Sequence, residues 1–118
     1  MSDGGTPGEG HTPRLAILIS GRGSNLQAFM DACASGALGA DIAVVLSNNP
    51  EAQGLERAAA AGIATLVINH RDFESREAFD AAMVAGLASY QPDLVILAGF
   101  MRILTSVFID EFEGRLMN

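Results

Sequence analysis

The residues best suited to chemistry in this chain form one short turn, Gly21-Arg22-Gly23-Ser24-Asn25. An apolar run precedes this turn, and the spacing of a helix begins directly after it. A strand–turn–helix unit of this kind directs unpaired backbone N–H groups and the positive end of a helix dipole at one small volume, which suits a phosphate. Glycines permit positive φ and let an anion approach the backbone without meeting a Cβ. The alternative is a tight turn that binds nothing, and the two glycines alone do not separate these interpretations.

The charge balance limits the ligands and partners of the chain. The formal net charge is −7, the pI is about 4.5, and all seven basic residues are Arg. Because no basic stripe is present to neutralise phosphates, we expect no nucleic-acid partner. The absence of Lys excludes a Walker A phosphate loop and a Schiff-base lysine within these residues. An anion must therefore be bound by backbone N–H groups, Asn or Ser side chains and scattered arginines, which is feasible for one small phosphate.

Length and composition fit one soluble globular domain, with 118 residues of which 49% are hydrophobic. We place this domain at residues 14–118, after a disordered leader at 1–13 that is rich in Gly, Pro and Thr and has no apolar signal region. No apolar run reaches membrane-spanning length, so we expect no membrane association. The single cysteine, Cys33, excludes an internal disulfide and favours a cytoplasmic protein. Its place on the apolar face of the first predicted helix indicates a small buried hydrophobe rather than a nucleophile.

Strand and helix patterns alternate along the chain. Ser24 and Ser75 are the predicted N-caps of the first and third helices, and the third helix is expected to bury Phe79, Met83, Leu87 and Tyr90. The patterns predict strands at 14–20, 41–47, 64–68 and 93–98, and helices at 24–35, at 51–61 and after Ser75.

This order of elements implies an α/β fold, a parallel sheet with helices on both faces. Ligands of such sheets bind beyond the carboxyl ends of the strands. Functional residues are therefore expected in the loops that follow the strands, at 20–25, 47–50, 69–75 and 98–104.

A dinucleotide site is the first alternative, and two details count against it. Leu26 stands where the third glycine of G-x-G-x-x-G belongs. The second predicted strand ends in Leu46-Ser47-Asn48, without the acidic residue that binds an adenine ribose. A mononucleotide phosphate fits the turn better.

Several segments resemble the phosphoribosylglycinamide formyltransferase family, folate-dependent enzymes of purine biosynthesis. The glycine turn lies in the first of them, Ile19 to Ala28, and the closest match is Asp93 to Leu104, which contains Ala-Gly-Phe-Met-Arg-Ile-Leu. Further matches follow the family's order at 45–49, 54–58, 61–63, 73–77 and 114–118. The resemblance covers residues 14–118 and implies the amino-terminal half of a Rossmann-like formyltransferase fold.

The resemblance also implies a reaction. The amino group of glycinamide ribonucleotide would attack the formyl carbon of the co-substrate 10-formyltetrahydrofolate, a step on the way to IMP, with no metal. Gly23, Ser24 and Asn25 would bind the ribonucleotide phosphate. Asn118 matches the family's catalytic asparagine, whose amide would stabilise the oxyanion of the tetrahedral intermediate. The folate site would be formed by Asn118 together with Arg76, Met101, Arg102, Ile103 and Leu104.

Without the resemblance these residues have simpler interpretations. Arg76 would be a solvated side chain, and the apolar residues at 101–104 would belong to the core. Arg102 is harder to dismiss, because a charge within an apolar run needs a partner. His70 is interpreted as an exposed loop histidine, and His11 belongs to the leader.

The chain departs from the family at its end. The family continues past the asparagine into Ile-His-Pro-Ser, whose histidine handles the transferred proton, and later to an aspartate. Since the attacking amine needs a positioned acid–base group, we expect a truncated portion that is inactive alone. The end falls within another expected strand, whose unpaired edge favours association, of which a homodimer is the simplest form. A non-catalytic module that binds a phosphorylated metabolite, and a formyltetrahydrofolate hydrolase, are the alternatives.

Overall fold

A computed structural model describes residues 12–118, and the prediction of a disordered leader at 1–13 lies outside them for residues 1–11. Five strands form one sheet: β1 (Arg14–Ile19), β2 (Asp41–Ser47), β3 (Thr65–Val67), β4 (Leu94–Leu97) and β5 (Leu116–Met117). The connections contain the helices α1 (Ser24–Ala34), α2 (Gln53–Ala60), α3 (Arg76–Ala88) and α4 (Ser106–Glu111), and a 3-10 turn, η1 (His70–Asp72). Just before β1, the Pro13 carbonyl accepts a hydrogen bond from the Asp41 amide at 2.9 Å.

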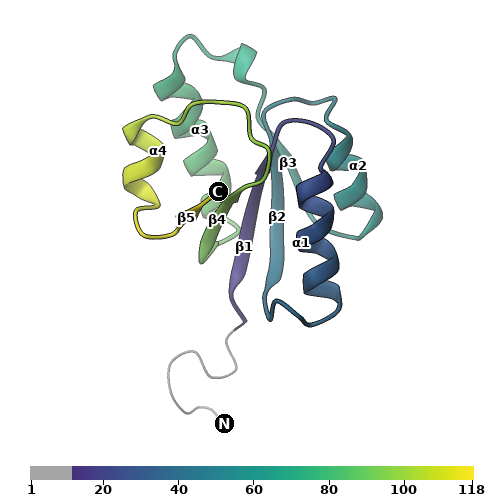
Figure 1. The fold of residues 1–118 in the computed structure, drawn as a ribbon. Helices are drawn as coiled ribbons and strands as arrows, with labels where there is room; N and C mark the ends of the chain where they lie inside the picture. The colour runs from purple at the N-terminus through teal and green to yellow at the C-terminus, as the bar shows by residue number, and fades with distance from the viewer. Residues whose placement is uncertain (1–11) are drawn as a thin grey trace.

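The strands are all parallel and lie in the order β3-β2-β1-β4-β5. β1 is the central strand, and its residues from Leu15 to Ile19 are buried on both faces of the sheet. Because the strands are parallel, their carboxyl ends all lie at one edge, the upper edge in Figure 1. The loops that follow β1 and β4, the two neighbours in the middle of the sheet, meet there.

Helices cover both faces of the sheet, as the α/β prediction requires (Figure 1). On one face, Leu15, Ile17 and Ile19 pack with Leu26 of α1 and Ala58 of α2. On the other face, the alternate β1 residues pack with α3 and α4 through Phe79, Met83, Leu87, Phe108 and Phe112. The fold prediction is confirmed, and α3 buries three of its four expected residues, with Tyr90 half-buried.

Several local predictions were wrong in detail. Gly23, not Ser24, is the N-cap of α1, and no side chain caps that helix. The cap residue has φ +80°, in the left-handed region that glycine adopts without strain, so the turn selects glycine there rather than serine. Ser75 is confirmed as the N-cap of α3, since its side chain accepts a hydrogen bond from the Ala78 amide at 3.1 Å.

Other differences concern whole elements. The sequence patterns gave no α4 and no η1, because each is short and carries little periodicity. The strand expected at the end of the chain is present as β5, at the edge of the sheet. Among residues 12–118, no helix has both the length and the apolar character needed to cross a membrane.

Candidate functional site

The turn between β1 and α1 is held in place through its carbonyl groups. The Gly21 carbonyl accepts from the Gly54 amide at 3.0 Å, and the Arg22 carbonyl accepts from Arg57 Nε at 2.8 Å. The Gly23 carbonyl starts the hydrogen-bond ladder of α1 by accepting from Gln27 at 2.8 Å. The turn is therefore fixed from behind by residues of α2.

The amide groups of the same turn remain free. Within residues 12–118, none of the backbone N–H groups from Gly21 to Asn25 donates a hydrogen bond. Helix α1 is 11 residues long, and the partial positive charge of its amino end lies at the same place. Free N–H groups and a helix dipole that converge in this way suit the binding of an anion. This arrangement is the one that the sequence of the turn predicted.

Two glycines of different elements make this arrangement possible. A Cβ on Gly23 would lie 2.7 Å from the Gly54 Cα, and a Cβ on Gly54 would lie 2.4 Å from Ile19 Cδ1. A Cβ on Gly23 would collide with the Gly54 backbone, whereas a Cβ on Gly54 would require the Ile19 side chain to move and would lie 3.2 Å from the Gly23 Cα. The amino ends of α1 and α2 therefore approach each other only because both residues are glycine.

The turn forms one wall of a cleft of about 280 Å³ at the carboxyl edge of the sheet. The opposite wall is the segment that follows β4. The cleft is lined by Ser20, Gly21, Arg22, Gly23, Ser24, Asn25, Ala98, Gly99 and Met101. A second cavity of about 360 Å³ shares Ser20 and Met101 with the first and extends over β2 and β3 to Asn48, Asn69 and His70.

Three polar side chains connect the ends of β1, β2 and β3. The Ser20 hydroxyl contacts Asn48 Oδ1 at 2.5 Å, and Asn48 Nδ2 lies 3.1 Å from His70 Nδ1. Asn48 is buried and His70 is half-buried, with its ring edge-on to Phe79 at 6.3 Å between centroids. The interpretation of His70 as an exposed loop histidine was wrong. The turn η1, in which the Asn69 side chain accepts from the Arg71 amide, brings the ring back over the sheet edge.

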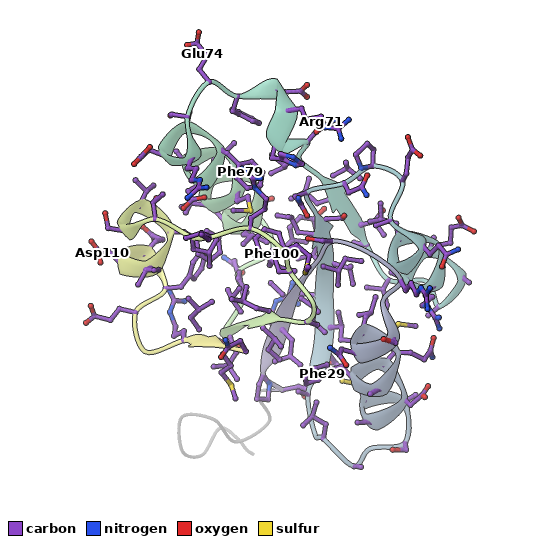
Figure 2. The ribbon with its side chains drawn as sticks, turned by 45° about the horizontal axis from the view of Figure 1, so that its top comes forward. Phe29, Arg71, Glu74, Phe79, Phe100 and Asp110 are labelled. Carbon is purple, nitrogen blue, oxygen red and sulfur yellow. The ribbon has the colours of Figure 1, made fainter. Side chains whose placement is uncertain are left out.

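The segment after β4 alternates between the core and solvent. Phe100 and Leu104 pack against the α3 side of the sheet, whereas Met101 and Ile103 are 79% and 69% exposed. Figure 2 shows Phe100 directed to the middle of the molecule, on the side of Phe79, while Asp110 of α4 points outward. Arg102 is half-buried and makes no hydrogen bond or ion pair within the described part of the chain.

The structure brings together some of the predicted site residues and leaves others apart. Gly23, Ser24, Asn25 and Met101 line one cleft. Arg76, at the start of α3, and Asn118, after β5, are exposed and make no contact with that cleft. Arg102, Ile103 and Leu104 lie on the same segment as Met101 but outside the lining, and their roles stay predictions.

Sequence reasoning placed Ser20 and Asn48 within the expected site loops without naming either as a site residue, and it missed Asp80. Ser20 and Asn48 each come directly at the end of a strand, and that position was the only local signal. Asp80 is fully buried on α3, and its Oδ2 accepts from both the amide and the hydroxyl of Thr105, at 2.6 and 2.7 Å. The sequence gives no signal for this role of Asp80, because a carboxylate inside an amphipathic helix pattern does not indicate a buried hydrogen-bond acceptor.

Cys33 lies away from this cleft, beside a separate cavity of about 320 Å³ that Met30, Asp41 and Ile63 also line. It is half-buried rather than buried, and it packs against the core of the α1 side. Burial, and secondarily the negative charge of Asp41, raise the pKa of its thiol. Because this favours the protonated thiol, the interpretation that Cys33 is not a nucleophile stands. Within residues 12–118, no three His, Cys, Asp or Glu side chains cluster as a metal site.

Comparison with known proteins identifies the family of this chain. The sequence model described as formyl transferase matches residues 13–118, nearly the whole chain. The chain belongs to the formyl transferase family.

Other members of the formyl transferase family are similar over the same residues. Phosphoribosylglycinamide formyltransferase of Escherichia coli K12 is 48% identical over 104 residues, which are 88% of this chain and 49% of that protein. The trifunctional purine biosynthetic protein adenosine-3 of Drosophila melanogaster is 52% identical over 107 residues, 89% of this chain and 8% of that protein.

Solved structures agree with these relatives. Glycinamide ribonucleotide transformylase 1 from Symbiobacterium toebii superposes with a TM-score of 0.87 and 44% identity, over 91% of this chain and 50% of that one. Phosphoribosylglycinamide formyltransferase from Coxiella burnetii, in complex with CHES, gives a TM-score of 0.85 and 40% identity, over 90% of this chain and 50% of that one. The chain therefore spans about half the length of its bacterial relatives.

Proposed function

We propose that this chain provides the ribonucleotide-binding part of a phosphoribosylglycinamide formyltransferase. Such an enzyme transfers the formyl group of 10-formyltetrahydrofolate to the amino group of glycinamide ribonucleotide, and we infer that it acts in the cytoplasm, in purine biosynthesis. The Escherichia coli relative that carries this name is 48% identical to this chain. The observation that carries the proposal is the turn at 21–25, whose carbonyls are bonded and whose amides are free.

The ribonucleotide phosphate would bind at this turn. The amides of Gly23, Ser24 and Asn25 are the donors, and the side chains of Ser24 and Asn25 line the same cleft. Backbone N–H groups bind an anion without the desolvation of a lysine, which suits a chain whose cations are all Arg. The ribose and the glycinamide would then extend along the cleft toward Met101.

The formyl donor would bind on the segment 101–104. The exposed Met101 and Ile103 offer an apolar surface to a pterin ring. Arg102, which has no partner in the described residues, and the exposed Arg76 would bind the carboxylates of the folate tail as charge-assisted pairs. We propose no metal, no nucleic-acid partner and no membrane partner for this reaction, and a homodimer as the form of association.

Asn118 would stabilise the tetrahedral intermediate of the transfer. It directly follows β5, whose Met117 pairs with Ile96 of β4, so its place is the carboxyl edge where the other site loops lie. Its side-chain N–H would donate to the oxygen of the tetrahedral intermediate as negative charge develops there. The attacking amine must also lose a proton to an acid–base group, and we assign that role to none of the described residues.

The test is substrate-dependent formyl transfer by the product of the complete reading frame. We expect tetrahydrofolate to form from 10-formyltetrahydrofolate only when glycinamide ribonucleotide is present. The matched control is glycinamide riboside, which lacks the phosphate and should bind at least roughly tenfold more weakly, since a charged hydrogen-bond partner contributes about 1.5 to 3 kcal/mol.

Two results would contradict the proposal. Deformylation without ribonucleotide would identify a formyltetrahydrofolate hydrolase. Ribonucleotide binding without any transfer would identify a non-catalytic binding module.

A further inference from the structure

The segment between β4 and α4 is held at both ends by side chains from other elements. Near its start, the Met101 amide donates a hydrogen bond to Ser20 Oγ at 2.8 Å. Ser20 lies 81 positions earlier in the chain. At its end, the amide and the hydroxyl of Thr105 both donate to Asp80 Oδ2. Between these two anchors lie the residues 101–104.

The Asp80 anchor is a costly one. Asp80 is fully buried, and its Oδ1 has no hydrogen-bond partner among residues 12–118. Burial of a carboxylate is unfavourable unless it is well hydrogen-bonded, so a fold that needed only packing here would favour an apolar residue. What this carboxylate provides, and an apolar residue could not, is the acceptor of the two short hydrogen bonds from Thr105. The same Thr105 hydroxyl also accepts from the Val107 amide at 3.3 Å and so caps α4.

The Ser20 anchor is itself oriented by its neighbours. The Ser20 hydroxyl has one proton, which it gives to Asn48 Oδ1, so its lone pairs face the Met101 amide. Asn48 is fixed in turn, because its Nδ2 lies next to His70 Nδ1. The position of the Met101 backbone therefore depends on β1, β2 and η1 together.

We propose that Ser20 and Asp80 are positioning residues for the formyl-donor site. Together they fix the backbone at both ends of 101–104, so that Phe100 and Leu104 face the core while Met101 and Ile103 face the ligand. This inference rests on the proposed function. It assigns a role to two side chains that the ligand need not touch, because a displacement of about 1 Å in a binding segment can cost roughly a hundredfold in rate.

The test uses Thr105→Val and Asp80→Asn in the product of the complete reading frame. Thr105→Val keeps the shape but removes the hydroxyl that donates to Asp80. Asp80→Asn is the conservative variant, since its amide oxygen still accepts from Thr105. We expect Thr105→Val to raise the KM for 10-formyltetrahydrofolate about tenfold, with the ribonucleotide KM within about twofold, because one hydrogen bond to a charged group is lost.

The second anchor is tested by Ser20→Ala, and Ser20→Thr, which keeps the hydroxyl, is its control. Hydrogen exchange gives a readout that needs no activity. The amide of Thr105 should exchange faster in Asp80→Leu, and the amide of Met101 faster in Ser20→Ala. The Asp80→Asn variant should retain most of the protection and most of the affinity for the formyl donor.

The outcomes separate this inference from the proposed function. If the wild type shows no formyl transfer, the proposed function fails before any variant is compared, and the positioning role falls with it. If the wild type is active and Thr105→Val leaves the formyl-donor KM unchanged, the positioning role alone is wrong. Equal losses for both substrates, with a lower melting temperature, would show a general structural role and would also overturn it.

Discussion

The two walls of the cleft are built in different ways. The turn at 21–25 is formed by backbone, with glycines that touch the backbone of α2 and carbonyls that are bonded there. The opposite wall belongs to the segment after β4, of which Met101 lines the cleft while residues 102–104 continue outside it. This segment is held by side chains, Ser20 at one end and Asp80 at the other, and it exposes apolar side chains of its own. One wall presents N–H groups that make no hydrogen bond among the described residues, and the other presents an apolar surface.

This difference indicates which substitutions each wall can tolerate. The turn should be very sensitive to added volume at Gly23, because a Cβ there would lie against the Gly54 backbone. The segment should tolerate changes in volume at its exposed positions but depend on charges and hydrogen bonds. The predictions below test this contrast, beginning with the largest expected effect.

The first prediction is that Gly23→Val strongly weakens ribonucleotide binding. Gly23 has φ +80°, and a Cβ there would lie 2.7 Å from the Gly54 Cα, so the variant combines backbone strain with overpacking. Each of these effects costs about 1 to 3 kcal/mol, and together they correspond to a loss of at least roughly thirtyfold in affinity. Calorimetric titration with glycinamide ribonucleotide measures it.

Gly21→Ala is the matched control within the same turn. A Cβ at Gly21 would meet nothing within 4 Å, and its backbone is not in the left-handed region. The affinity of this variant should stay within about twofold of the wild type, because surface substitutions without strain rarely exceed about 0.5 kcal/mol. Equal losses for the two variants would show that the backbone does not form this wall as described.

The second prediction concerns the other wall. Arg102→Gln should raise the KM for 10-formyltetrahydrofolate about tenfold to thirtyfold, because it removes a charged donor that contributes about 1.5 to 3 kcal/mol. The ribonucleotide KM should not change. Arg71→Gln is the control, since Arg71 is an exposed arginine of the same sheet edge that lines only the second cavity. A similar effect of both substitutions would indicate long-range charge rather than a specific contact.

The same contrast explains how far the sequence could predict this molecule. The turn, the parallel sheet and Ser75 as a helix cap follow from local patterns, because each depends on residues near one another in the chain. Asp80 meets Thr105 across 25 positions and Ser20 meets Met101 across 81, and nothing local signals such pairs. His70 was misjudged for the same reason, since its partner Asn48 lies on another strand. The glycine wall could be predicted, whereas the anchors of the other wall required the structure.

The third prediction uses Ser24 and Ser75, the two serines that were both predicted from the sequence to be helix N-caps. Ser75 caps α3 through its side chain, whereas Ser24 is the first residue of α1 and caps nothing. Ser75→Ala should therefore lower the free energy of unfolding by about 1 kcal/mol and leave substrate affinities unchanged. Ser24→Ala should leave stability within about 0.5 kcal/mol and weaken ribonucleotide binding about fivefold, because one hydrogen bond to the phosphate is lost. Thermal unfolding and titration of both variants separate the roles, and the reverse pattern would exclude Ser24 from the phosphate site.

The smallest effect is expected behind the turn, at Arg57. Its Nε donates to the Arg22 carbonyl at 2.8 Å, and its other guanidinium nitrogen donates to Gln27 Oε1 at 3.1 Å, so it links α2 to both sides of the turn. Arg57→Met keeps the apolar stem and removes both bonds, but the Gly21 carbonyl still accepts from Gly54 and limits any movement. Ribonucleotide affinity should fall only about threefold, equivalent to roughly 0.6 kcal/mol, with the formyl-donor KM unchanged. Gln27→Met removes the second Arg57 bond, together with an exposed bond from Gln27 Nε2 to Asp31 Oδ1 within α1, and leaves the first, and it should show less than half of that loss in free energy. A thirtyfold loss in Arg57→Met would mean that side chains, and not the contact between two glycines, fix the position of this wall.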